Sequence, residues 1–238
     1  MIAAHQTMLA PHGGPSSLDY VQDSAFLFFD GIENAGRKSH TNTPGTWTNL
    51  AGGPDASPVS SCNATWKTDA LAFAETGAYD IPLSGVTWPT GGMTIEIAYR
   101  WAQYGSWAGR IICSGFASYG RIDFYNPGSA SGNADIGWGA GAFKINSLTK
   151  APPTYATVAI RGYANQTGVS VRVFGSTQTI STSQYPRYKQ SYLRVGNVPD
   201  MNRGFLGDVC AIRVHSRQLT DAEVDANAAL DRQRFGVT

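Results

Sequence analysis

Aromatic side chains form the densest group of potential ligand-binding residues in this sequence. Trp101, Tyr104 and Trp107 fall within seven residues, and Tyr119 follows them. Sugars present flat C–H faces that pack on aromatic rings, while polar side chains hold their hydroxyl groups. We therefore predict a carbohydrate-binding site at Trp101, Tyr104, Trp107 and Tyr119. The alternative for Trp101 is a place in the core between two sheets; Tyr104 and Trp107 lie in a turn region and are better candidates for exposure.

Motifs for nucleophilic catalysis and for metal binding are missing. The segment Gly128-Ser129-Ala130-Ser131-Gly132 has alanine where a Gly-x-Ser-x-Gly nucleophile elbow needs serine. No glycine-rich phosphate loop followed by Lys and Ser/Thr is present. The histidines have no metal-ligand spacing, and we expect His215, in the link between the last strand and the helix, to have a capping role or to lie at the surface. The sequence favours a binding protein over an enzyme.

Short strands must position these residues. The 27 glycines, 11% aromatic and 15% charged residues are typical of a β-rich globular protein. Residues 93–101 alternate most clearly, which places Glu96 on a solvent-facing side, where it could pair with Arg100 or with a cross-strand arginine. Further strands are expected at residues 26–31, 110–114, 121–125, 135–138, 142–145, 155–161, 169–174 and 192–196. Residues 70–82 are expected to form a hairpin around Gly77, and residues 54–61 a loop. This pattern predicts two packed antiparallel sheets.

The last strand and the helix after it have the strongest local signals. From residue 208, Cys210, Ile212 and Val214 alternate with Ala211 and Arg213, so we place the two sets on opposite faces.

A short helix follows that strand. Thr220 and Glu223 have the spacing of a capping box, and Leu219 and Val224 that of a hydrophobic staple. We expect the helix to end near Gly236.

Two segments carry a family resemblance. Residues 204–237 resemble the end of laminin-G-like jelly-roll domains of the concanavalin A-like superfamily. The matching residues are Phe205, Gly207, Ile212, Arg213, Val214, Leu219, Thr220, Glu223 and Val224. The opening Asp30-Gly31-Ile32-Glu33-Asn34, followed by Thr46-Trp47-Thr48-Asn49-Leu50, resembles laminin-G-like proteins of phages and prophages. The resemblance implies an all-β, concanavalin A-like (laminin-G-like) two-sheet antiparallel jelly-roll sandwich with a short C-terminal helix.

The superfamily includes glycosidases, so catalysis needs a separate test. Retaining β-glucanases of this fold carry Glu-x-Asp-x-(x)-Glu on one strand. Here Glu96 is followed by Ala98 and Arg100, and a lone carboxylate cannot act as both nucleophile and acid. We therefore predict that the chain is not an enzyme.

Calcium is the one cofactor that the resemblance brings into question, because many laminin-G-like domains hold an ion in rim loops. Asp123, Asp135, Asp200 and Asp208 lie near expected strand ends or in loops. They form no compact oxygen-rich motif, so we name no metal ligand and predict no cofactor.

Residues 1–19 are rich in Ala, Pro, Gly and Ser and are predicted to form an arm outside the domain at residues 20–238. We expect this arm to bind a partner through His5, Pro11, His12 and Pro15. The start of the chain lacks the pattern of a signal peptide.

Charge and hydropathy exclude two classes of partner. The formal net charge is +1, without the basic stripe that nucleic-acid binding requires. No apolar run approaches the ~20 residues that cross a bilayer. The sequence predicts no nucleic-acid partner and no membrane insertion.

These observations favour a phage virion protein for structure, decoration or attachment, with a lectin-like domain that binds host-surface or mucosal glycans. The arm would bind other virion proteins, and a symmetric homo-oligomer is expected. The alternative is a carbohydrate-binding module of an extracellular bacterial protein. The lack of a signal-peptide pattern argues against this alternative.

Overall fold

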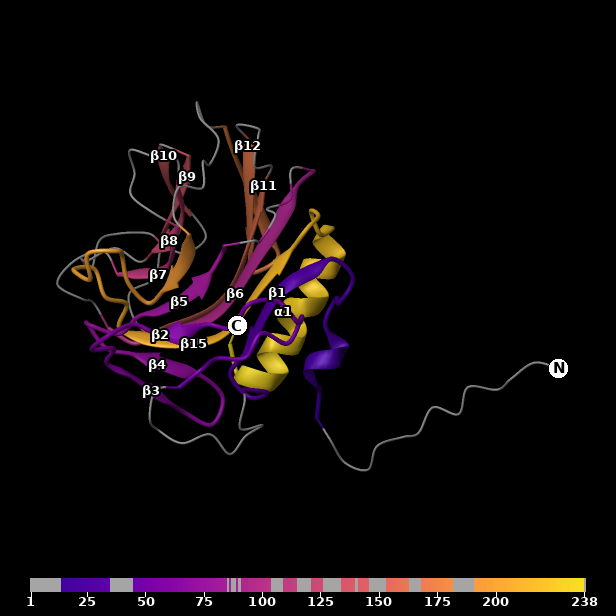
Figure 1. Cartoon of the computed structure of the whole chain (residues 1–238). Coiled ribbons are helices and arrows are strands. Elements are labelled where there is room, and N and C mark those ends of the chain that lie inside the picture. The colour runs from indigo at the N-terminus through magenta and orange to yellow at the C-terminus, as the bar shows by residue number, and fades with distance from the viewer. Residues whose placement is uncertain are drawn as a thin grey trace.

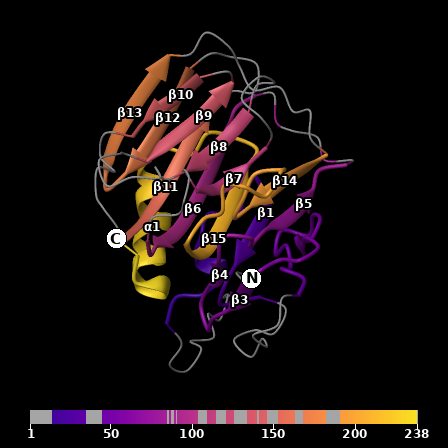
Figure 2. The same ribbon diagram turned by 90° about the vertical axis from the view of Figure 1, so that its left-hand side faces the viewer.

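The structure is a computed structural model. It describes residues 14–34, 45–84, 86, 89, 91–103, 109–114, 121–125, 134–139, 141–145, 153–162, 168–181 and 191–237. Two antiparallel β-sheets face each other, and one α-helix lies on the outer side of one of them (Figures 1 and 2). The predicted all-β jelly-roll sandwich with a short C-terminal helix is confirmed.

The larger sheet contains eight strands. They are β1 (Ala25–Asp30), β3 (Ala64–Trp66), β4 (Leu71–Phe73), β6 (Met93–Trp101), β11 (Thr154–Gly162), β12 (Gly168–Val173), β13 (Ser176–Ser181) and β15 (Gly207–His215). Their order is β13-β12-β11-β6-β15-β4-β3, and β1 also pairs with β15. Strand β6 pairs along its length with β11 and β15, so these three strands form the centre of the sheet.

The smaller sheet contains seven strands. They are β2 (Ser57–Pro58), β5 (Tyr79–Pro82), β7 (Arg110–Cys113), β8 (Arg121–Tyr125), β9 (Asp135–Gly139), β10 (Gly141–Lys144) and β14 (Tyr192–Val195). Their order is β10-β9-β8-β7-β14-β5-β2. The main apolar core lies between the two sheets, where removal of apolar surface from water drives their packing.

A β-bulge shifts the alternation of β15. The pairing with β6 passes from Val209 opposite Tyr99 to Ala211 opposite Ala98, which leaves Cys210 as the extra residue. Val209 therefore joins Ile212 in the main core, whereas Cys210 and Ala211 pack on the helix side. The expectation that Cys210 shares a face with Ile212 is wrong because of this extra residue.

Helix α1 (Asp221–Phe235) begins and ends as the sequence predicts. The Glu223 amide donates to Thr220 Oγ1 at 3.2 Å, and the Thr220 amide donates to Glu223 Oε2 at 2.7 Å. Leu219 and Val224 are buried in one cluster, and Gly236 caps the end in the left-handed conformation with φ 66°. Within the described residues, no helix is long and apolar enough to cross a membrane.

Three expected elements differ in the structure. Strands β4 and β5 belong to opposite sheets, so residues 70–82 carry the chain across the sandwich and form no hairpin. The expected loop at residues 54–61 contains the short strand β2. The strand expected at residues 169–174 stops at Val173, because Phe174 and Gly175 turn the chain into β13.

The division of the chain into an arm (1–19) and a domain (20–238) stays a prediction. Residues Ser17–Asp19 form a 3₁₀ turn, η1, with a capping box between Ser16 and Asp19. Tyr20, directly after this turn, is buried against the domain.

Candidate functional site

Trp101 belongs to the core between the sheets. Its side chain is 3% exposed, and its indole Nε1 donates to the Gln103 carbonyl at 2.7 Å. This is the alternative that the sequence left open for Trp101, and it leaves no ring face for a sugar. Tyr104, Trp107 and Tyr119 lie outside the described residues, so a carbohydrate site at those loops stays a prediction.

The predicted partner-binding arm is described only at its end. His5, Pro11 and His12 lie outside the described residues. Pro15 lines a cavity of about 350 Å³ together with Asp69 and Arg234, so it lies near the end of α1. Partner binding through these residues stays a prediction.

A buried ion network joins the larger sheet to α1, and it includes Glu96. Arg213 Nε donates to Glu96 Oε2 at 2.9 Å, and its two terminal nitrogens donate to Asp231 at 2.8 and 2.6 Å. Glu96, Arg213 and Asp231 are all fully buried. The expected solvent-facing position of Glu96 is wrong, because α1 covers that face of β6. Burial raises the pKa of Glu96, but the positive charge of Arg213 and the nearby His215 ring outweigh burial and hold the pKa below its usual value.

Other side chains complete this network. Tyr20 and Thr157 donate to Asp231 at 2.7 and 2.8 Å. His215 Nε2 lies 3.5 Å from Glu96 Oε2, and its ring is fully buried, so the surface position expected for His215 is wrong. Strand β1 pairs with β15 here, with Ala25 opposite His215. The network fixes the helix to the sheet and leaves no open space for a ligand.

The outer face of the smaller sheet carries a second set of charges. Strand pairing places Arg194 between Cys113 and Asp80, and Arg194 donates twice to Asp80 at 2.7 Å. On the neighbouring strands, Arg110 Nε lies 3.5 Å from Asp123. Arg110, Asp123 and Arg194 are at most 5% exposed, so these pairs stabilise the sheet and are closed to a large ligand.

The aspartates considered for calcium are dispersed. Asp208 accepts from Lys67 and Arg100, and Asp200 accepts from Asn202. In the part of the chain that the structure describes, no three His, Cys, Asp or Glu side chains gather in a way that could hold a metal ion.

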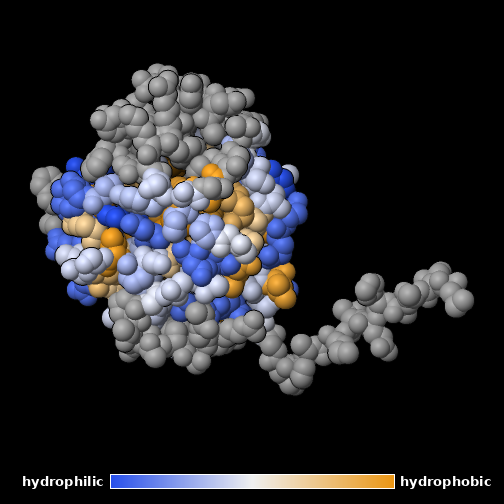
Figure 3. All heavy atoms as spheres, viewed as in Figure 1, coloured by the Kyte–Doolittle hydropathy of each residue, from blue (hydrophilic) through white to orange (hydrophobic). Residues whose placement is uncertain are grey.

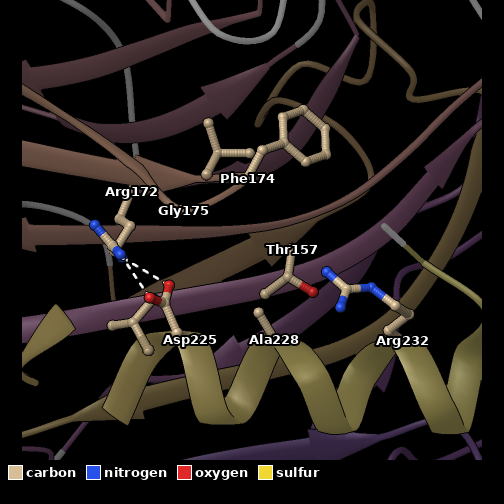
Figure 4. A pocket seen from close by; sticks show the side chains of 9 residues that line it. Thr157, Arg172, Phe174, Gly175, Asp225, Ala228 and Arg232 are labelled. Atoms are coloured by element: carbon tan, nitrogen blue, oxygen red, sulfur yellow. Dashed lines mark hydrogen bonds and ion pairs between the residues drawn. The ribbon is translucent and has the colours of Figure 1, made fainter. Parts of the chain in front are cut away.

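The remaining candidate is a cavity of about 290 Å³ at the edge of α1, which we call the helix-edge pocket (Figure 4). It lies between the helix, β11 and the turn that joins β12 to β13. Its lining residues are Thr157, Arg172, Val173, Phe174, Gly175, Val224, Asp225, Ala228 and Arg232. Surface hydropathy does not mark a site by itself, because the face in Figure 3 mixes hydrophilic and hydrophobic residues.

Phe174 is the unusual residue of this pocket. It has φ 51° and Gly175 has φ 72°, the backbone of a two-residue turn that normally uses Asn-Gly or Asp-Gly. A bulky side chain in the left-handed region is strained. Phe174 is nevertheless 43% exposed, so burial does not offset this strain, and part of the residue faces solvent at the pocket.

The polar groups of the pocket differ in their availability. Arg172 is held by Asp225 at 2.8 and 2.5 Å and by Asp221 at 2.9 Å. In Figure 4 the Arg232 side chain rises from α1 beside Thr157, with Phe174 above them. Among the described residues, Arg232 is exposed and its guanidinium has no hydrogen-bond or ion-pair partner. The pocket thus offers an aromatic ring and one available cation.

Sequence reasoning missed both of these groups. In the sequence, Phe174 is the last residue of the strand expected at residues 169–174. Arg232 is one of several polar residues in the expected helix and has no distinguishing signal. The only available signal was Gly175, which follows Phe174 at the point where the alternation of residues 169–173 ends.

Comparison with known proteins identifies a fold but no family. No protein-family model and no curated protein matches the sequence. Among solved structures, Trypanosoma rangeli sialidase with the inhibitor DANA matches with a TM-score of 0.62 and 15% identity, over 84% of this chain and 32% of the sialidase. The same sialidase with sialic acid matches with a TM-score of 0.56 and 14% identity, over 90% of this chain and 34% of the sialidase.

A toxin structure has the same fold. The structure titled "Cell entry of botulinum neurotoxin type C is dependent upon interaction with two ganglioside molecules" matches with a TM-score of 0.59 and 11% identity, over 90% of this chain and 52% of the toxin chain. The chain therefore spans about a third of the sialidase chains and about half of the toxin chain. The fold shared with these structures is a two-sheet β-sandwich.

These comparisons contradict the prediction that the chain is not an enzyme, because the structures that share its fold include sialidases. The carboxylate pattern of glucanases, which this sequence lacks around Glu96, is not required by sialidases, because sialidases use a tyrosine nucleophile. A missing carboxylate pair therefore does not exclude hydrolysis.

Proposed function

We propose that this chain is a carbohydrate-binding domain and that a sugar binds in the helix-edge pocket against Phe174. The observation that carries the proposal is the exposed Phe174 ring, which is held in a strained turn beside the available guanidinium of Arg232. Strained residues gather at ligand sites, where function compensates for their cost.

The chemistry of the pocket suits a sugar. An aromatic ring packs on the C–H face of a pyranose, and a few convergent polar groups fix its hydroxyls. A volume of about 290 Å³ lies near the lower end of small-molecule sites, which fits one sugar unit. Tyr155, 41% exposed and two residues before Thr157 on β11, extends the aromatic surface on the same face.

The structures with this fold support the same class of ligand. One sialidase structure is described as a complex with sialic acid, and the toxin as dependent on gangliosides for cell entry. Those ligands belong to those proteins, and for this chain they support only the proposal that a glycan is bound.

The variant Phe174→Asn separates binding from folding. Asparagine tolerates the left-handed conformation, so the free energy of unfolding should stay the same or rise. Sugar affinity should fall roughly thirtyfold, the effect of losing an aromatic anchor that contributes about 2 kcal/mol. Titration calorimetry with hits from a glycan array, beside urea unfolding, measures both quantities.

Two controls complete that experiment. Leu50→Asn changes an exposed apolar residue in a distant turn (38% exposed) and should leave affinity unchanged. Trp107→Ala tests the loop site expected from the sequence. Unchanged affinity in Phe174→Asn, together with loss in Trp107→Ala, would place the sugar at that loop and refute the pocket.

We also propose that the domain is carried on a phage virion, tied to other virion proteins by the arm before η1 and assembled as a homo-oligomer. The phage-like opening segment at residues 30–50 supports this proposal. A second support is the fixed base of the arm, where the Val21 amide donates to Asn227 at 3.1 Å and Tyr20 donates to Asp231.

Deletion of residues 1–13 tests the virion proposal, because it leaves Ser16–Tyr20 and their contacts intact. The truncated protein should keep its unfolding midpoint and sugar affinity but lose assembly in light scattering and incorporation into particles. A full-length protein that is monomeric, with glycan affinity equal to that of the truncated form, would favour the extracellular bacterial module.

A further inference from the structure

Two arginines line the helix-edge pocket, and they differ in whether a carboxylate already pairs with them. Arg172 is paired, and Arg232 is available. Arg172 donates hydrogen bonds from the edges of its guanidinium to Asp225, Asp221 and Thr177, and its hydrogen bond to Asp225 lowers the pKa of that carboxyl group. Asp221 also pairs with Arg161, so these residues form an ion cluster beside the N-terminal half of α1. A ligand in the pocket could therefore bind the Arg172 guanidinium only by breaking one of its ion pairs.

Arg232 is different from most arginines of this protein. Eight others in the described part form ion pairs with carboxylates: Arg100, Arg110, Arg161, Arg172, Arg194, Arg213, Arg217 and Arg234. The positions three and four residues away on the helix face hold Ala228, Ala229, Phe235 and Gly236, none of which is acidic. The helix itself therefore offers Arg232 no partner.

The position of Arg232 also favours a fixed cation. It lies in the last turn of α1, where the negative end of the helix dipole stabilises a positive charge. Thr157, beside it in Figure 4, directs its hydroxyl proton to Asp231. The Thr157 oxygen can then accept a hydrogen bond from a sugar hydroxyl near Arg232.

We infer that the helix-edge pocket selects sugars that carry a carboxylate, with Arg232 pairing to that group while Phe174 packs on the ring. A guanidinium binds a carboxylate through two parallel hydrogen bonds, a geometry that a neutral hydroxymethyl group cannot reproduce. This inference rests on the proposed function, and it adds which class of sugar the site prefers.

The test uses pairs of sugars that differ only at one carboxylate. Glucuronides, galacturonides and sialosides are each measured by calorimetry beside their carboxyl-reduced counterparts. The wild-type protein should bind at least one acid tenfold or more tightly than its reduced form. Arg232→Gln should bring that ratio close to one, because the loss of affinity falls mainly on the acid. Arg203→Gln, which changes an exposed arginine outside the pocket, should keep the wild-type ratio.

The outcomes separate this inference from the proposed function. If the wild type binds acid and reduced sugars equally and Phe174→Asn weakens both, the carboxylate preference is refuted and the sugar site stands. If Arg232→Gln keeps a tenfold preference for the acid over the reduced sugar, Arg232 does not bind the carboxylate, and the inference is refuted. If no sugar of either kind binds the wild type, the proposed function itself fails.

Discussion

Replacement of Asp231 by alanine is expected to lower the free energy of unfolding by about 3–5 kcal/mol, the largest loss expected for a single polar residue of this chain. The Asp231 carboxylate accepts two hydrogen bonds from Arg213 and one each from Tyr20 and Thr157. Its removal leaves the buried Arg213 guanidinium with only the Glu96 carboxylate as an ion-pair partner. It also leaves the hydroxyl groups of Tyr20 and Thr157 without the acceptor they use. Urea unfolding followed by tryptophan fluorescence measures the loss.

Asp225 provides a matched control on the same helix. It also makes two contacts with one arginine, Arg172, but its side chain is 47% exposed. Exposed ion pairs contribute about 1 kcal/mol or less, so Asp225→Ala should change stability little. Equal losses in the two variants would show that burial of the network does not determine its contribution.

Replacement of Gly204 by alanine is expected to cost about 3 kcal/mol, because the added methyl group meets backbone on the neighbouring segment. A Cβ atom there would lie 2.5 Å from the carbonyl carbon and 2.6 Å from the Cα of Glu75, and closer still to the carbonyl oxygen. Gly109 approaches the same place, since its own Cβ would lie 2.6 Å from the Gly204 oxygen. No flexible side chain is available to move aside.

Gly168→Ala is the comparison for that variant. A Cβ atom at Gly168, the first residue of β12, has no neighbour within 4 Å. This variant should keep its stability or gain up to about 1 kcal/mol from a less flexible unfolded chain. A small loss in Gly204→Ala, similar to that control, would mean that the junction at residues 75, 109 and 204 can open without cost.

The sequence predicts the elements of this fold whose signals are local. Alternation over nine residues marks β6 with its observed ends, and the Thr220–Glu223 spacing marks the start of α1. Both signals arise within a few residues, so they do not depend on which segments meet in space. The resemblance at both ends of the chain then indicates the sandwich.

The buried network and the pocket could not be predicted in the same way. Glu96 and Arg213 are 117 residues apart, and only the pairing of β6 with β15 brings them together. Without that pairing, a charged residue at an alternate position of a strand is expected to face water. Phe174 fits an apolar strand pattern, and its turn is set by Gly175 and by the return of β13.

The hydrogen bond between Tyr20 and Asp231 has a consequence for how this fold can be used. It joins two residues that are 211 positions apart in the sequence, so the segments around Tyr20 and Asp231 meet on one side of the domain. A circular permutant that links them by a short peptide and opens the chain at a surface turn should keep all of the strand pairs. For the same reason, this unit can be inserted into a loop of a larger host protein without forcing the two sides of that loop apart.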